Sequence, residues 1–321
     1  MKKYDITAFG EILIDFTYIK DSEENQKLFA QNAGGAPANV LVCATKLGCQ
    51  TAFLGKVGKD MHGDFLRKTL ENENVNVNGL ISDENYFTTL AFVDLNDKGE
   101  RSFSFARKHG ADTFMKVNEI DLETIKNSKI FHIGSLSLTT EFIKGTTLYA
   151  VVKAKESGTI LSYDPNYRAS LWESREKAEK EIRLIIPFAD IMKISDEECE
   201  LVTGKKDPEL AAKYLIEQGV QIVCVTLGEN GVLVANKKNS MQVSGFKPKQ
   251  VADTTGAGDS FWGAFLSKVV KTGKDLDKIP FENLCNFAKF ANATASLCVE
   301  KTGAIRAMPS LEQVNSKILD I

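Results

Sequence analysis

The chain has 321 residues, of which 43% are hydrophobic, and its formal net charge is −3. This length allows one large α/β domain or roughly two average ones, with a sizeable core. The slightly acidic balance argues against nucleic acid or an anionic membrane as a partner. Residues 1–10 lack the features of a signal peptide, and no apolar run approaches the roughly 20 residues of a membrane span, so we expect a cytoplasmic protein.

Short apolar runs alternate with helical segments along most of the chain. Gly48 directly follows an Ala-rich segment, in the position where glycine commonly ends a helix. This alternation predicts an α/β fold with a mostly parallel sheet and helices on both faces. The predicted elements are, in chain order, strand 6–9, helix 37–47, strand 51–57, helix 61–73, strands 130–133 and 160–163, helix 175–188, strand 191–194, helix 209–218 and strand 220–227.

Two regions alternate polar and apolar residues instead. They are 11–19 and the pair 88–94 and 100–107, which a short Gly-containing segment joins as in a β-hairpin. Such alternation is typical of a sheet with one face in water. We therefore predict a small β-sheet lid that stands off the main domain and covers a ligand, formed by segments near 11–35 and 86–112.

The strongest motif is the heptapeptide DTTGAGD at 253–259, which runs directly into an apolar helix of small residues. The N-terminus of a helix carries partial positive charge and unpaired N–H groups. Gly256 and Gly258 allow the backbone to approach an anion without an intervening Cβ. We therefore predict that the amides of Gly256, Ala257 and Gly258 bind phosphate oxygens.

Asp259 is an unexpected residue beside such an anion site, because its charge would repel a phosphate. The carboxylate is explained if it accepts the proton of a hydroxyl group while that hydroxyl attacks a γ-phosphorus. We therefore predict that Asp259 is a catalytic base. The alternative is that it caps the helix that follows.

Two motifs together resemble a known family. The heptapeptide is similar to the C-terminal signature of the ribokinase-like (PfkB) carbohydrate kinases, and GGAPAN at 34–39 is similar to their N-terminal signature, about 220 residues earlier. Walker and protein-kinase motifs are absent from the sequence. The resemblance covers essentially the whole chain. It implies one kinase domain over 1–321, a three-layer α/β/α sandwich with a small β lid, and phosphoryl transfer from ATP to a sugar.

The expected sugar site lies near the N-terminal motif. Asp15 stands in an apolar stretch, where a carboxylate is costly unless it is paired or accepts ligand hydrogen bonds. Gly34 and Gly35 would let the backbone approach a sugar ring, and Asn39 can both donate and accept. The resemblance implies that Asp15, Gly35 and Asn39 bind sugar. The alternatives are an ordinary turn before a helix and a solvated asparagine.

Further sugar contacts are expected from the lid and from the end of strand 160–163. Phe103, Phe105 and Arg107 lie on the predicted lid, where the aromatic rings either exclude water from the sugar or form the lid's own core or a homodimer contact. Arg168 is a candidate phosphate clamp, with a surface salt bridge as the alternative. The string D-x-N-x-R-x-x-L-W at 164–172 resembles that of fructokinases and 2-keto-3-deoxygluconate kinases. It implies fructose as acceptor, with 2-keto-3-deoxygluconate, another sugar or a nucleoside as alternatives.

The remaining candidates concern ATP and metal ions, and they rest on the resemblance. Glu198 matches the glutamate of a family motif that organises Mg²⁺-bound water, although Ser195 replaces the asparagine; an acidic first helical turn is the alternative. The expected nucleotide-binding residues are Ser195, Thr226, Gly228, Gly231, Gly258 and Asn292.

The family often binds a monovalent cation, usually K⁺, beside the anion loop. The corresponding residues here are Asp253, Thr255, Cys298, Lys301, Gly303 and Ala307. Small-molecule sugar and ATP are thus the expected partners, with Mg²⁺ and optionally K⁺ as cofactors. A different class of function, a catalytically silent sugar or nucleotide sensor on a kinase scaffold, remains as the rival hypothesis.

Overall fold

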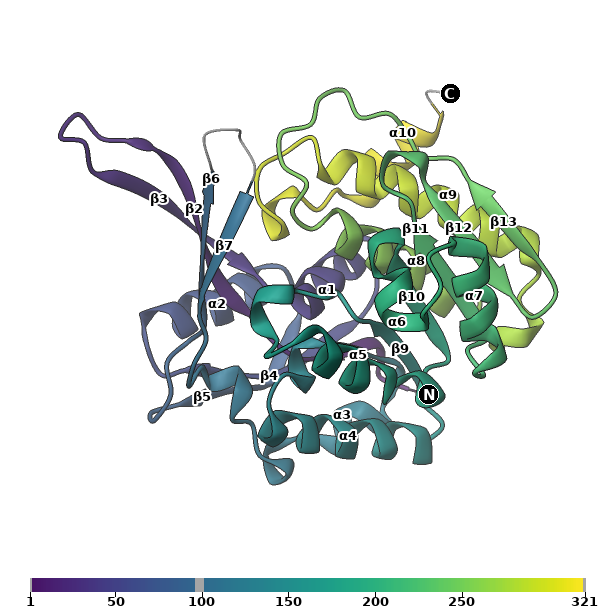
Figure 1. The fold of residues 1–321 in the computed structure, drawn as a ribbon, viewed down its shortest axis with the longest axis horizontal. Coiled ribbons are helices and arrows are strands. Elements are labelled where there is room, and N and C mark those ends of the chain that lie inside the picture. Colours follow the sequence, from purple (N-terminus) through teal and green to yellow (C-terminus); the bar gives the residue numbers. More distant parts are fainter. Residues whose placement is uncertain (1, 96–100, 320–321) are drawn as a thin grey trace.

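The computed structural model describes residues 2–95 and 101–319, and no helix in that part is long and apolar enough to cross a membrane. Its main element is a nine-stranded sheet (Figure 1). Seven strands pair in parallel, and two more extend one edge through antiparallel pairing. In spatial order the strands are β13 (Ser240–Val243), β12 (Val232–Asn236), β11 (Ile222–Thr226), β10 (Ile191–Ser195), β9 (Ile160–Asp164), β8 (Ser128–Gly134), β1 (Tyr4–Phe9), β4 (Thr51–Gly58) and β5 (Asn76–Asp83).

Helices cover both faces of this sheet, and each face has its own buried core. Alternate strand residues divide between them: Ile222 and Cys224 belong to one core, Val223 and Val225 to the other. This division is the signature of a three-layer α/β/α sandwich and confirms the predicted fold class. The first core contains residues of α1 (Ala36–Lys46), α2 (Met61–Asn72), α8 (Ala257–Lys271), α9 (Phe281–Cys298) and α10 (Leu311–Leu319); the second contains residues of α3 (Leu122–Lys126), α4 (Glu141–Glu156), α5 (Arg175–Arg183), α6 (Cys199–Thr203) and α7 (Pro208–Glu217).

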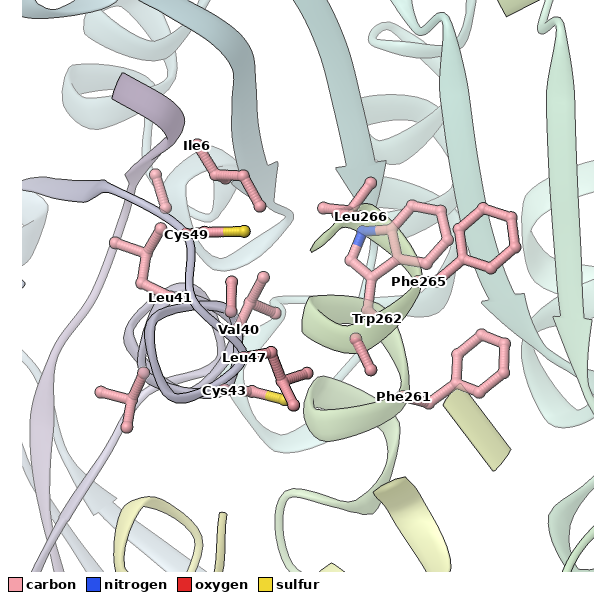
Figure 2. Close-up of a cluster of buried hydrophobic side chains, with 14 of the residues drawn as sticks. Ile6, Val40, Leu41, Cys43, Leu47, Cys49, Phe261, Trp262, Phe265 and Leu266 are labelled. Carbon is pink, nitrogen blue, oxygen red and sulfur yellow. The ribbon is translucent and has the colours of Figure 1, made fainter. Parts of the chain in front are cut away.

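Helices α1 and α8 approach each other closely, although more than 200 residues separate them. Figure 2 shows Val40 and Leu41 of α1 in the same cluster as Trp262 and Phe265 of α8. At Gly263 of α8 an added Cβ would lie 2.5 Å from the Val40 carbonyl oxygen, so only glycine permits this approach. The contact matters for the site, because both helices begin at the same cavity.

A second, four-stranded sheet stands beside the main one. Its order is β3 (Lys27–Gly34), β2 (Leu13–Asp21), β6 (Leu90–Leu95) and β7 (Arg101–Ala106), with β2 parallel to β6. In Figure 1 the β2–β3 hairpin extends away from the body of the molecule. Aromatic rings of Phe16 and Phe92 stack with centroids 5.3 Å apart, so this sheet has a small apolar core of its own. The turn expected at 96–99 lies outside the described residues.

Most element boundaries lie within two residues of the sequence predictions, and one helix is clearly shorter than predicted. The helix expected over 175–188 ends at Arg183, and a short 3₁₀ turn, Ile186–Phe188, follows. Pro187 explains the change, because proline has no N–H to donate to the Arg183 carbonyl four residues earlier and its ring clashes with that carbonyl. The strand expected over 220–227 begins only at Ile222, and Val220 instead follows helix α7.

Candidate active site

A cavity of about 290 Å³ lies where the parallel strands end and the second sheet begins. Loops that follow β1, β8 and β9 form its floor, the N-terminal turns of α1 and α8 form its walls, and β2 and β7 of the second sheet border it. The carboxyl ends of parallel strands are the usual ligand site of open α/β sheets. The lining residues are Glu11, Leu13, Asp15, Gly35, Ala36, Asn39, Phe105, Leu136, Asn166, Arg168, Thr254, Thr255, Gly256, Gly258 and Asp259.

Asp259 lies in the first turn of α8 with its carboxylate held from two sides. Asn39 Nδ2 donates to Oδ2 at 2.8 Å, and Asn166 Nδ2 donates to Oδ1 at 3.3 Å. Asn166 adopts the left-handed conformation (φ 45°), which asparagine tolerates better than most residues. The sequence prediction did not include Asn166, although the D-x-N-x-R string contains it.

The environment of Asp259 suits a general base. Burial raises its pKa to about 6, whereas the Asn39 hydrogen bond and the charges of Lys193 and Arg168 oppose that rise. The carboxylate is therefore mostly ionised at neutral pH, yet it is basic enough to take a proton during reaction. Its geometry and its pKa agree with the predicted role.

A buried ion pair lies directly beneath the glycine loop. Lys193 Nζ is 2.7 Å from Asp164 Oδ2, and a Cβ added to Gly258 would lie 3.3 Å from that same Nζ. Asp164 Oδ1 also accepts the Asn166 N–H at 3.2 Å, which links the pair to the residue beside the base. The sequence prediction missed both charges; the available signal was a lysine inside an otherwise apolar strand.

The glycine loop itself has the predicted backbone. Gly256, the N-cap of α8, has φ 79°, and an added Cβ would lie 2.9 Å from Ala304 Cβ. The Ala257 N–H donates to the Thr254 carbonyl at 3.3 Å. Binding of phosphate by the amides of Gly256, Ala257 and Gly258 stays a prediction. It fits this helix terminus, although the Ala257 amide would have to exchange its bond to Thr254 for the phosphate.

The predicted sugar residues converge on the opposite wall. A Cβ on Gly34 would overlap Asp15 Oδ2, and a Cβ on Gly35 (φ 112°) would lie 2.5 Å from the Glu11 carbonyl oxygen. Burial raises the pKa of Asp15 to about 7, opposed by Arg168 and assisted by the charges of Asp253 and Asp259. These glycines thus allow a carboxylate and the start of α1 to meet at the cavity.

Glu11 is a wall residue that the sequence prediction did not single out. It is 3% exposed, and its Oε1 accepts the Ala36 N–H at 3.0 Å at the start of α1. Within the described residues its Oε2 has no hydrogen-bond partner, and neither has Asn39 Oδ1. The only sequence signal was a glutamate directly after a buried strand.

The remaining candidates for sugar contacts, on the lid and on the loop after β9, occupy different positions. Phe105 and Arg168 line the cavity, and the side chain of Phe103 lies outside the described part of the structure. Arg107 is buried beside the cavity but does not line it. Its guanidinium pairs with Asp112 at 2.7 Å and donates to Thr139 Oγ1 at 2.8 Å.

The nucleotide candidates form a row along the carboxyl ends of β10 and β11. Ser195 and Thr226 are register partners in these strands. A Cβ at Gly231 (φ 94°) would overlap the Val243 carbonyl oxygen, which accepts from Asn292 Nδ2 at 3.1 Å. Gly228 (φ 57°) lies in the turn between β11 and β12. The row therefore leads away from the glycine loop.

Glu198 is tied to the backbone on both sides. Its Oε2 accepts the Ser195 N–H at 2.8 Å and its Oε1 accepts the Tyr167 N–H at 2.6 Å. The Glu198 N–H in turn donates to Ser195 Oγ at 3.3 Å, which completes a capping box, and Glu198 lies in the acidic first turn that the sequence analysis gave as the alternative. They join the loop after β10 to the loop that carries Asn166 and Arg168.

The residues expected around a monovalent cation also come together. Asp253 Oδ1 accepts the Thr255 N–H at 2.7 Å, and Oδ2 accepts the Gly303 N–H at 3.0 Å. The Cys298 carbonyl accepts the Lys301 N–H at 3.2 Å, and Ala307 is buried in the 3₁₀ turn that follows. The anion loop and 298–307 are thus neighbours.

Comparisons with known proteins give matches over nearly the whole chain. Residues 3–311 match the family described as pfkB family carbohydrate kinase. The chain is 42% identical over 309 residues to probable fructokinase-2 of Arabidopsis thaliana. This alignment covers 95% of this chain and 93% of that relative.

Solved structures match equally completely. A fructokinase from Xylella fastidiosa with bound ATP has a TM-score of 0.90 at 32% identity, covering 100% of this chain and 99% of its own. A fructokinase double mutant from Vibrio cholerae O395 with fructose, ADP and potassium ion has a TM-score of 0.87 at 30% identity, covering 98% and 99%. A putative ribokinase II from E. coli in complex with ATP and Mg²⁺ has a TM-score of 0.87 at 26% identity, covering 99% and 100%.

Proposed function

Since this chain belongs to the pfkB family of carbohydrate kinases, and is therefore an ATP-dependent sugar kinase, we propose that its acceptor is fructose and that Asp259 is its catalytic base. The observation that carries the proposal is the position of the Asp259 carboxylate. It lies at the N-terminus of α8, lines the cavity, and is oriented by Asn39 and Asn166.

In the proposed reaction the acceptor hydroxyl lies against Asp259. The carboxylate takes the proton while the hydroxyl oxygen attacks the γ-phosphorus of ATP, and the bond from that phosphorus to the ADP oxygen breaks in line. The products are fructose phosphate and ADP, and no covalent enzyme intermediate forms. Lys193 lies beneath Gly258 and contributes positive charge on the side where the transferred group carries negative charge.

The residues present fit a magnesium site of the kind found in kinases. Mg²⁺ usually needs only one or two carboxylates besides water and substrate phosphates. Glu198 would hold it through water, and the bound ion would neutralise charge on the ATP phosphates. The row from Ser195 and Thr226 to Asn292 would hold the nucleotide.

We place an optional K⁺ between the anion loop and 298–307. Asp253 supplies a buried carboxylate there, and the neighbouring carbonyl groups include that of Cys298. The last predicted position is Ala307, which has only its carbonyl to offer. A K⁺ at this place would support the backbone of the loop from below.

The charges of the cavity favour a neutral sugar over 2-keto-3-deoxygluconate. Glu11, Asp15 and Asp259 all line it, and Arg168 is the one cation among the described lining residues. A carboxylate-bearing acceptor would need a second cation, and the Arg107 guanidinium is already bound to Asp112. Fructose has several hydroxyl groups and no ionisable acid group, and so avoids this conflict.

The second sheet is proposed to act as a lid and as a dimer contact. Phe105 on β7 lines the cavity, so closure of this sheet would exclude water from the sugar. Ile19, Leu28 and Phe92 on the same sheet are exposed apolar residues that a second copy of the chain could cover. Sedimentation of the wild type and of Ile19→Asp tests the dimer, which the substitution should dissociate.

The function is tested with a coupled assay of ADP release over fructose, ribose and 2-keto-3-deoxygluconate, with and without K⁺. We expect the highest kcat/KM with fructose. Higher turnover of 2-keto-3-deoxygluconate would refute the fructose assignment. Binding of sugars without any turnover would support the rival sensor function.

A further inference from the structure

Three carboxyl groups line the cavity, but the proposed function uses only two of them. Asp259 serves as base and Asp15 as sugar ligand, whereas Glu11 has no part in that scheme. Glu11 follows β1 directly, and its Oε1 accepts the Ala36 N–H at 3.0 Å. This bond fixes the side chain on the wall of the cavity and occupies one of its two oxygens.

The second oxygen of Glu11 is buried without a partner. Five buried side-chain atoms in the described part of the chain lack a hydrogen-bond partner, and two of them, Glu11 Oε2 and Asn39 Oδ1, belong to this wall. Their residues are only 3% and 4% exposed. Both atoms are acceptors at the N-terminal turn of α1. Because a buried unpaired acceptor is costly, such a pair points to a ligand that supplies hydroxyl donors.

The charge state of Glu11 determines what it can recognise. Burial raises its pKa to about 7; the nearby positive charge of Arg107, its own backbone N–H and the Ala36 N–H oppose that rise, and the charge of Asp112 adds to it. At pH 8 the group is mostly ionised, so both oxygens can only accept hydrogen bonds. Arg107 itself is held by Asp112 and by Thr139, so its guanidinium is committed to these partners.

We propose that Glu11 is a sugar-binding residue whose Oε2 accepts a hydrogen bond from one hydroxyl group of the acceptor. The ligand class is an uncharged sugar with at least two hydroxyl donors, one for Glu11 and one for Asn39 Oδ1. The proposal rests on the proposed function in one respect, namely that the acceptor occupies this cavity.

The test combines Glu11→Gln with monodeoxy analogues of fructose at pH 8. Glutamine keeps the shape, and its amide oxygen can still accept the Ala36 N–H, but it presents a donor in place of Oε2. We expect the KM for fructose to rise about tenfold or more, since hydrogen bonds to charged groups are the stronger ones. One deoxy analogue lacks the hydroxyl bound by Glu11, and its KM with the wild type should be higher than that of fructose. The ratio of these two KM values should be at least fivefold smaller with the variant. The KM for ATP should stay unchanged, and the melting temperature should not fall, because the substitution removes a buried group whose charge is costly.

Glu181→Gln is the matched control. Glu181 on α5 is also a buried glutamate whose Oε2 has no partner within the described residues, but it pairs with Lys144 and lies outside the cavity. Its substitution should leave the KM for fructose as in the wild type.

If each analogue raised the KM over that of fructose by the same factor in the wild type and in Glu11→Gln, the proposal would be overturned. Glu11 would then be only a cap of α1. Calorimetry with the sugars alone, without ATP, separates this failure from that of the proposed function. If Glu11→Gln bound sugar more weakly than the wild type, this would support the Glu11 contact even if no phosphoryl transfer occurred. Absence of binding by every sugar would overturn both.

Discussion

Replacing Asp259 with Asn separates catalysis from stability. The variant keeps the shape of the side chain but removes the base, so kcat should fall by roughly 10²–10⁴-fold. Folding should not suffer. A shift of the pKa from 3.8 to about 6 means that burying the ionised group costs about 3 kcal/mol at high pH.

The sign follows from linkage. Because folding raises this pKa, the cost is absent below about pH 4, develops up to about pH 6 and is complete above it. Asparagine removes this cost. It also loses roughly 1 kcal/mol of hydrogen-bond energy, because Asn39 and Asn166 each donate to one carboxylate oxygen and the new NH₂ group cannot accept. The net expectation is a variant about 1–2 kcal/mol more stable than the wild type at pH 8, and no more stable at pH 4.

Steady-state kinetics and urea unfolding at the two pH values measure both effects. Asp121→Asn is the control, because Asp121 caps the short helix α3 outside the cavity and its replacement should leave kcat unchanged. Wild-type turnover by Asp259→Asn, or a clear loss of stability at pH 8, would refute the reasoning and make Asp259 a structural residue.

Three further predictions concern the same cavity. The kcat/KM for sugar should fall from about pH 7 downwards as Asp15 and Glu11 become protonated, and more steeply below about pH 6 as Asp259 follows; a pH–rate profile of the wild type that stayed flat from pH 8 to pH 5 would contradict this. Gly34→Ala places a Cβ on Asp15 Oδ2, so the KM for fructose should rise about tenfold or more while that for ATP is kept; equal changes in both would point to general misfolding. Lys193→Met leaves Asp164 buried without its cation and should destabilise the fold by about 3–5 kcal/mol in urea unfolding, whereas a loss below about 1 kcal/mol would show that the pair is solvated.

Local sequence patterns were sufficient to predict the layers of the fold. Buried strands such as β8 and β10 are short apolar runs, and the second sheet shows the alternation of a half-exposed surface. The helix end at Arg183 was missed although Pro187 marks it. The strands β5, β12 and β13 were missed. The strand β13 is mostly exposed and carries little apolar signal, whereas β12 is a buried apolar run whose signal was present in the sequence.

The site was predictable where glycine and carboxylate patterns are local. Asp259, Gly256 and Asp15 were found because a glycine loop or an acid in an apolar stretch is visible in a few residues. Glu11 and Lys193 were not found, because their meaning depends on partners far along the chain. Lys193 lies beneath Gly258 only after β10 and α8 have packed, and no spacing within either segment announces that contact.

The chain from Glu11 to Asn39 leaves the main sheet, forms β2 and β3 of the second sheet, and returns as the first turn of α1. The proposed acceptor contacts and the proposed lid therefore share one uninterrupted stretch of backbone. A chimera that took β2 and β3 from a relative would replace Asp15 and Gly34 with that relative's residues, so its acceptor preference should change wherever those residues differ.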